Sequence, residues 1–154
     1  MKIGSEAAKA AGAIDPGAGR VMDRVALLLR ALDWADARPS GWCGDAADAA
    51  TFRVLVAAAA AQGVTDAGEM CALLGGEPPA QLRQCEPDVA HSPVLAGERL
   101  SAALEAIGWA LGKLERVSTD DAVYLGALAR AVTMRGDYYA GIVRAAAAGS
   151  RNAR

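Results

Sequence analysis

The sequence predicts an all-α protein, folded as a compact bundle of five to seven helices, two of them short. Three observations favour this class. Alanine, which has the highest intrinsic helix propensity, supplies 38 of the 154 residues, with runs at 57–61 and 145–148. Apolar residues recur at helical spacing, and no segment shows the polar–apolar alternation of a half-buried strand. Capping residues followed by proline or acidic residues mark several helix starts along the chain.

The N-terminal part of the chain predicts an arm and one helix. Residues 1–14 are small and polar and lack a stripe of bulky side chains, so we expect a flexible N-terminal arm. Asp15 followed by Pro16 predicts an N-cap and a first turn, and the helix should run to about Ala37. The apolar stripe of this helix consists of Val21, Val25, Leu28 and Leu32.

The next part of the chain predicts three helices. Asp45 begins a helix that reaches Gln62 and stops at Gly63, because glycine commonly ends helices. Thr65 then caps a short helix over 66–74, which Gly75 and Gly76 close. A second short helix begins at the two prolines of residues 78–79 and ends before Pro87.

The C-terminal part predicts three more helices. Ser92 and Pro93 give a cap and a first turn for a helix to about Val117. The polar run 118–121 caps a helix to about Arg135, and 138–148 forms the last helix. These elements make a single helical domain over 15–148, followed by a basic C-terminal tail over 149–154.

The helix that begins at Pro93 carries two neighbouring apolar features. One is a continuous bulky ridge, formed by Leu100, Leu104, Ile107, Leu111 and Leu114. The other is a smooth strip of small residues, formed by Gly97, Ser101, Gly108 and Gly112. Charged residues on the rest of this helix argue against a membrane, so we expect the strip to receive another helix of the bundle at close range.

Three large apolar residues fall on charged helix faces. Leu27 and Trp34 share a face with Arg20 and Arg30 on the first helix, and Trp109 lies among Glu105 and Lys113 on the later one; an apolar group on such a face needs a second neighbour. The neighbour is either another helix of the same domain, with arginine stems covering the ring, or a partner protein. Both explanations remain open, and the second makes Leu27, Trp34 and Trp109 candidate interaction residues.

The C-terminal end predicts an alternative nucleic-acid site. Residues 130–154 carry five arginines against one aspartate, and arginine with tyrosine suits phosphate contact and base stacking. The candidate residues are Arg135, Tyr138, Tyr139, Arg144, Arg151 and Arg154. The other explanation is that the tyrosines pack the last helix and the arginines favour its negative end.

Cysteine and histidine provide the only candidates for site chemistry. Cys43 precedes a helix N-terminus, which lowers a thiol pKa, and it could act as a nucleophile if His91 were its base. Cys43, Cys71, Cys85 and His91 have the right number for zinc but lack a paired-ligand spacing. We therefore expect packed cysteines, no metal and no cofactor.

Other function classes lack support in the sequence. The longest apolar run has eight residues, far short of a membrane span, and the N-terminus lacks the apolar stretch of a signal peptide. Residues 65–88 can be drawn as a helix-turn-helix, but five acidic residues against one basic residue oppose DNA binding there. Three cysteines at irregular spacing fit a reducing compartment better than a set of disulfides. Together these features predict a cytoplasmic location.

The sequence thus predicts a non-enzymatic helical interaction protein, either self-associating or an accessory subunit of a larger assembly. A bacterial or phage origin follows from 13 arginines against 3 lysines and the heavy use of alanine and glycine. Its partner would be another protein or a second copy. The alternatives are a nucleic-acid-associated subunit that uses the C-terminal end, and a small enzyme with a Cys43 nucleophile.

Overall fold

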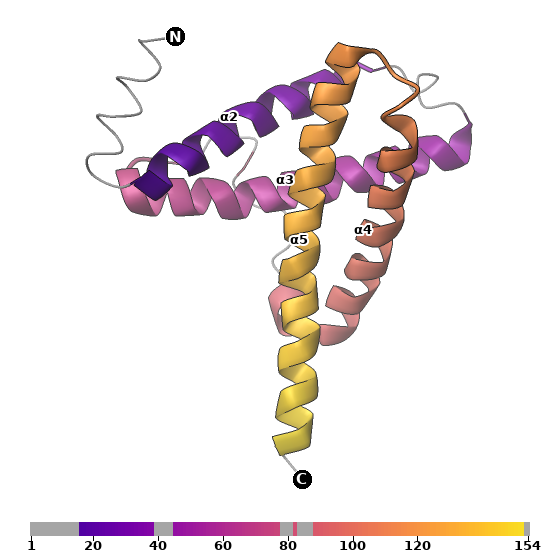
Figure 1. Cartoon of the computed structure of the whole chain (residues 1–154). Helices are drawn as coiled ribbons and strands as arrows, with labels where there is room; N and C mark the ends of the chain where they lie inside the picture. The colour runs from indigo at the N-terminus through magenta and orange to yellow at the C-terminus, as the bar shows by residue number, and fades with distance from the viewer. Residues whose placement is uncertain (1–15, 39–44, 78–81, 83–87, 153–154) are drawn as a thin grey trace.

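The computed structural model describes residues 16–38, 45–77, 82 and 88–152 (Figure 1). Within these residues the protein is all-helical and has no strand, in agreement with the predicted class. The elements are α2 (Pro16–Asp36), α3 (Ala46–Leu74), the 3₁₀ helix η3 (Val89–His91), α4 (Pro93–Lys113) and α5 (Thr119–Asn152). The predicted arm over 1–14 lies outside the described residues.

Four α-helices in the described residues replace the predicted five to seven, partly because α3 does not stop at Gly63. Gly63 is buried in the middle of α3, where a Cβ atom would lie 2.7 Å from Leu82 Cδ2 and 2.9 Å from Leu28 Cδ2. This glycine therefore permits close packing and does not end the helix. Most of the short helix expected from residue 78 lies outside the described residues, although Leu82 itself is fully buried.

The helix α5 is also continuous where two helices were expected. It runs through the predicted break at 136–137 and continues to Asn152, into the predicted tail. Gly136 is buried there, and a Cβ atom on it would meet only Leu100 Cδ1, at 3.7 Å. The packing of α5 against α4 thus holds the helix together across a residue of low helix propensity.

Three of the predicted helix starts are confirmed by their caps, whereas the start expected at Thr65 falls inside the continuous helix α3. The side chains of Asp45 and Ser92 accept hydrogen bonds from Asp48 N (2.9 Å) and Leu95 N (3.2 Å) at the starts of α3 and α4. Ser118 does the same for Asp121 N (3.2 Å) ahead of α5. At the other end of α3, Gly75 adopts φ 79°, a left-handed value that suits glycine, and its N–H donates to Cys71 O. The helix α4 ends at Lys113, four residues earlier than expected.

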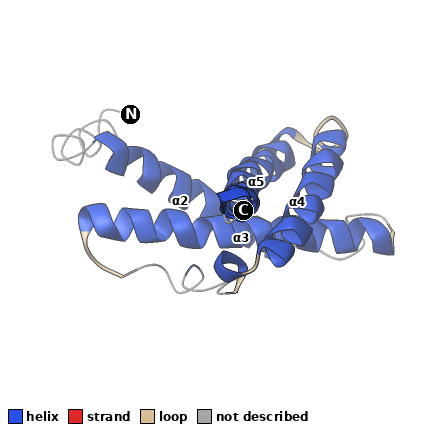
Figure 2. Cartoon of the chain, turned by 90° about the horizontal axis from the view of Figure 1, so that it is seen from below, coloured by secondary structure: helices blue, strands red, loops and turns tan. Residues whose placement is uncertain are grey.

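The four α-helices form two antiparallel pairs that cross each other. Figures 1 and 2 show α2 beside α3, and α4 beside α5, with α5 crossing over the first pair. Both α3 and α5 contact each of the other three α-helices, so these two helices form the centre of the fold. The helix α2 lies between α3 and α5 and so has neighbours on two sides.

Alanine forms much of the interior. The buried residues of α4 are all alanines, namely Ala96, Ala103, Ala106 and Ala110. Methyl groups let helix axes approach closely, and a few large side chains then fill the space between them. The largest fully buried side chains among the described residues are Tyr139, Leu55, Leu82, Leu125, Leu128, Val21, Val89 and Val132.

Candidate interaction surface

Trp34, one of the three residues expected to mark an interface, lies inside the protein. Its side chain is 7% exposed, and its ring stacks on Tyr124 and meets the edge of Phe52, each at a centroid distance of 6.0 Å. The indole Nε1 donates a hydrogen bond to Asp121 Oδ1 at 2.8 Å. The Arg38 guanidinium, which pairs with Asp121 at 3.2 Å, lies 5.0 Å from the centre of the Trp34 ring. Every group that covers Trp34 here belongs to the same chain.

Trp109 packs onto the same aromatic cluster from α4. Its ring lies 5.8 Å from Phe52, and its Nε1 donates to Asp48 Oδ1 at 3.0 Å. Lys113 Nζ donates to Asp48 Oδ2 at 3.3 Å and lies 5.8 Å from the centre of the Trp109 ring. The charged residues around Trp109 therefore join α4 to the first turn of α3.

In this structure Trp34 is enclosed and Trp109 is half-buried, and the groups described around them belong to the same chain. The sequence placed both tryptophans on solvated faces because each helix was given only one neighbour. In the fold, α2 contacts both α3 and α5, and α4 contacts both α3 and α5. Leu27 is half-buried at the junction of α2 and α5. The internal neighbour, which the sequence left open, is what the structure supplies.

The described C-terminal arginines and tyrosines do not all lie on one exposed site, because Arg135 and Tyr139 are buried. Arg135 is 5% exposed, donates to Thr65 Oγ1 at 3.0 Å, and has its guanidinium carbon 4.2 Å from the Tyr138 ring centre. Tyr139 is also buried. Both residues lie in the middle turns of α5, which pass through the core. There they join α5 to α3. Their proposed contact with nucleic acid is therefore not available in this structure.

The other residues of that alternative are placed in part, and Tyr138 packs against both Arg135 and Tyr139. Tyr138 and Arg144 are exposed on α5. The Arg151 side chain and all of Arg154 lie outside what the structure describes.

The cysteine and histidine candidates are placed only in part. Cys43 and Cys85 lie outside the described residues, so a Cys43–His91 pair stays a prediction. His91 is exposed in η3, and Cys71 is a half-buried free thiol near the end of α3. Among the described side chains, no group of three or more histidine, cysteine, aspartate or glutamate residues is placed to hold a metal ion.

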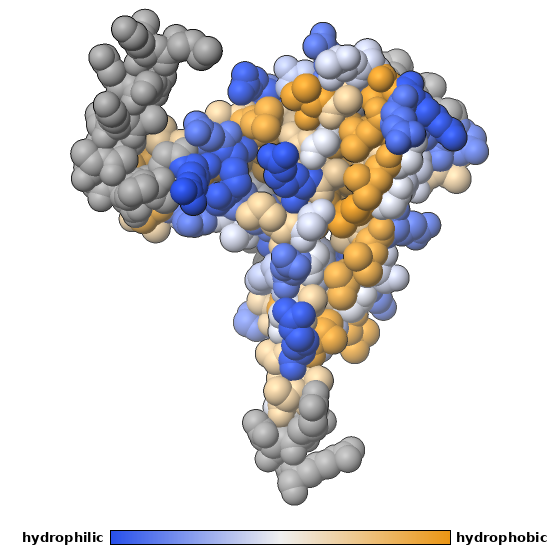
Figure 3. All heavy atoms as spheres, viewed as in Figure 1, coloured by the Kyte–Doolittle hydropathy of each residue, from blue (hydrophilic) through white to orange (hydrophobic). Residues whose placement is uncertain are grey.

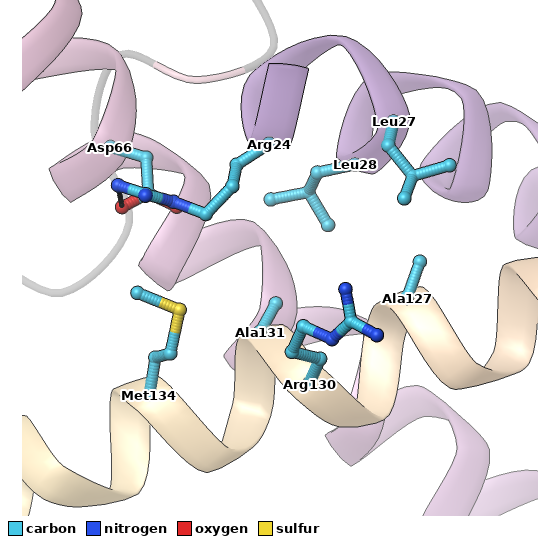
Figure 4. Close-up of a pocket in the computed structure, with 8 residues that line it drawn as sticks. All are labelled: Arg24, Leu27, Leu28, Asp66, Ala127, Arg130, Ala131 and Met134. Carbon is cyan, nitrogen blue, oxygen red and sulfur yellow. Dashed lines mark ion pairs between the residues drawn. The ribbon is translucent and has the colours of Figure 1, made fainter. Parts of the chain in front are cut away.

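A small pocket between α2, α3 and α5 contains a buried carboxylate (Figure 4). Asp66 accepts a hydrogen bond from Gln62 Nε2 at 3.2 Å and pairs with Arg24 Nη2 at 3.6 Å. Burial removes water from the carboxylate and raises the pKa of Asp66 above its ordinary value of 3.8, while Arg24 and Gln62 partly oppose this shift. The cavity volume of about 40 Å³ suits a few water molecules.

A wider groove lies where α3, α4 and α5 meet. It has a volume of about 400 Å³ and an alanine floor, with Arg53 and Arg99 among its lining residues and Tyr139 on the α5 side. Two guanidinium groups beside an apolar floor can receive an acidic group attached to an apolar chain.

A largely exposed apolar region of α4 combines part of the smooth strip with two leucines of the neighbouring ridge. Leu104 and Leu111 are 60% and 57% exposed. A Cβ atom on Gly108 would meet nothing within 4 Å, so no other helix approaches there. We call this region the α4 face, formed by Gly97, Ser101, Leu104, Gly108 and Leu111. Figure 3 shows a stripe of hydrophobic residues along α4 on the side drawn, next to α5.

The exposure of the α4 face corrects two expectations about this helix. The bulky ridge does not point into the core as a unit, because only Leu100, Ile107 and Leu114 pack against it. Among the glycines of the smooth strip, the described residues approach only Gly97, where a Cβ atom would lie 4.0 Å from Val143 Cγ2, and the strip is open at Gly108 and Gly112. The buried alanines occupy the opposite side, and their spacing (96, 103, 106 and 110) is helical. In an alanine-rich chain, that spacing was the available signal for the core side.

Comparison with protein-family models, curated proteins and solved structures finds no match for this chain. None of the described helices is both long and apolar enough to cross a membrane.

Proposed function

We propose that this chain is a non-enzymatic interaction protein that binds a protein partner through the α4 face, as a self-associating or accessory subunit of a larger assembly. One observation carries the proposal. Leu104 and Leu111 are more than half exposed, and none of the five residues that form the α4 face is charged. Isolated exposed leucines are ordinary on protein surfaces, whereas contiguous apolar patches are typical of binding surfaces.

The composition of the α4 face supports a protein partner. Glycine and serine let a partner helix approach closely, and the flanking leucines supply apolar area to bury. Glu98 and Glu105 lie beside this face and form a charged border on one side. An apolar centre with a charged border is the usual arrangement of a protein–protein interface.

Site-specific photocross-linking in the cells that make the protein tests this proposal. A benzophenone amino acid replaces Leu104 in one variant and exposed Asp33 of α2 in a control variant. We expect an adduct of defined mass from position 104 and none from position 33. The captured protein is then purified and must bind the unmodified chain in solution, and Leu111→Glu must remove that binding.

The leucine substitution has its own folding control. Because Leu111 is mostly exposed, its replacement by glutamate should leave the circular dichroism spectrum and the unfolding midpoint nearly unchanged. Absence of any adduct at position 104 would contradict the proposal, as would an adduct whose formation is unaffected by Leu111→Glu.

A further inference from the structure

The α4 face has a spacing that suits pairing with another helix. Its residues fall at positions 97, 101, 104, 108 and 111, with intervals of four, three, four and three. This is the seam of a heptad repeat, in which residues of one helix insert between residues of the other. Large and small residues alternate along the central part of the seam, because Leu104 and Leu111 flank Gly108.

We infer that the α4 face binds the α4 face of a second copy of this chain, antiparallel and related by a two-fold axis near position 106. This inference rests on the proposed function of the same face. Antiparallel pairing about that axis places Leu104 opposite Gly108 of the second copy, and Leu111 opposite Ser101 of the second copy. Each large side chain then meets a small one, and the two-fold axis repeats both contacts.

Parallel pairing of the same seam is a poorer fit. It places Leu104 opposite Leu104 and Gly108 opposite Gly108 of the second copy. The leucines would then hold the helices apart, while the glycines would leave a gap that no side chain fills. The alternation of sizes thus favours the antiparallel orientation.

The charges beside the face favour the same orientation. Glu98 lies in the first part of α4, and Arg116 lies in the turn after it; both are exposed and have no ion pair within the described part of the chain. Antiparallel pairing brings Glu98 near Arg116 of the second copy at both ends of the interface. Parallel pairing would instead place the two Glu98 side chains on opposite sides of the interface, each far from Arg116 of the second copy, so this ion pair would not form.

Engineered cysteines test the orientation directly. In a background with the three native cysteines replaced by serine, Glu105→Cys lies close to the proposed axis and should form a disulfide-linked dimer under mild oxidation. Glu98→Cys alone lies roughly 12 Å along the helix from the axis, so its two copies should stay unlinked. Glu98→Cys combined with Arg116→Cys should become linked again, because the two positions come together between copies.

Other outcomes separate this inference from the proposed function. Linkage of Glu98→Cys alone would contradict the antiparallel pairing and overturn the inference. A chain that sediments as a monomer at several hundred micromolar, with no linkage in any variant, would also overturn it. The broader proposal would then stand only if position 104 is photocross-linked to a different protein, and both would fail without such an adduct.

Charge reversal provides a second test. Glu98→Arg and Arg116→Glu should each raise the dimer dissociation constant, measured by sedimentation equilibrium, by about threefold to tenfold. The double variant should return it close to the original value, because the pair is restored with opposite sign. Additive weakening in the double variant would contradict the proposed pairing of these residues.

Discussion

At the scale of the residue, the buried tryptophans depend on polar partners that come from other helices. Trp34 Nε1 donates to Asp121 and Trp109 Nε1 donates to Asp48, and each aspartate also pairs with a cation. An indole ring supplies a large apolar area, but its N–H must be satisfied when water is removed. The two carboxylates therefore let aromatic rings fill a core that is otherwise made mainly of methyl groups.

Asp120 and Asp121 allow a matched test of this dependence. Both lie in the first turn of α5 and both favour the positive end of the helix dipole, but only Asp121 contacts Trp34 and Arg38. Asp121→Ala should lower the free energy of unfolding by about 1–3 kcal/mol more than Asp120→Ala, because it leaves a buried N–H without an acceptor. Urea denaturation followed by tryptophan fluorescence measures the difference, and equal effects would contradict this role.

Asp66 gives the stability a dependence on pH. Because burial raises its pKa in the folded state, the folded protein holds a proton on Asp66 between pH 3.8 and the raised pKa, while the unfolded chain has released it. Stability from this group is thus fully present below pH 3.8 and is lost as the pH rises through the folded pKa.

Comparison with Asp66→Asn should reveal that dependence. The wild-type free energy of unfolding, minus that of Asp66→Asn, should fall as the pH rises from about 4 and become constant above the folded pKa. Urea denaturation at several pH values provides the measurement. A difference that increases with pH would show that the Arg24 pair, and not desolvation, dominates at this carboxylate.

At the scale of the element, glycines of similar sequence context have opposite roles in α3. Gly63 is enclosed by Leu28 and Leu82, which are themselves buried and cannot move aside. Gly68, five residues later, is exposed, and a Cβ atom on it would meet nothing within 4 Å. Burial, and not helix propensity, therefore decides what each glycine contributes.

Alanine substitution at these two positions should give opposite results. Gly63→Ala should destabilise the protein by about 1–3 kcal/mol through overpacking, in spite of the higher helix propensity of alanine. Gly68→Ala should stabilise it by up to about 1 kcal/mol. Thermal unfolding of both variants measures the effects, and a stabilising Gly63→Ala would mean that Leu82 can shift to make room.

The starts of the helices were predictable from sequence, whereas their continuity was not. Caps such as Asp45 and Ser92 act through hydrogen bonds to residues two or three positions away, so the local sequence contains the whole interaction. Gly63 and Gly136 are held within helices by residues distant in the chain, Leu82 and Leu100 among them. The local sequence shows only the low helix propensity of such a glycine and none of these distant contacts, which is why breaks were predicted there.

At the scale of the whole molecule, α5 has a central part and a projecting part. Its middle turns cross the other helices, whereas Figure 1 shows its C-terminal end extending beyond α4. Tyr139 is buried, but Ala145, Ala147 and Ala148 are exposed. The last turns therefore contribute little to the core.

Truncation should separate these two parts of α5. A chain that ends at Arg144 should keep the unfolding midpoint of the full protein and lose only some helical circular dichroism. A chain that ends at Asp137, without Tyr139, should unfold more than about 5 °C lower, because a fully buried aromatic residue is missing. An equal loss in both chains would mean that the projecting turns are part of the stable fold.

The candidate surface depends on the arrangement of the whole molecule, so the sequence predicted it only in part. The strip from Gly97 to Gly112 was recognised as a place for close helix approach, but the approaching helix was assigned to the same chain. The tryptophans were expected to have a second neighbour, but the sequence left open whether that neighbour was a helix of the same chain or a partner. Only the crossing of the two helix pairs shows that Trp34 is enclosed and that Leu104 is open.

The alanine side of α4 has a consequence for how this protein can change over time. At Ala96, Ala103, Ala106 and Ala110 the side chain is already the smallest that retains good helix propensity. Shrinkage there is limited to glycine, and nearly every other substitution adds volume to a closed contact. Tolerated variation in α4 should therefore be one-sided, with its inner positions almost fixed in size and its outer positions free to drift unless a partner constrains them.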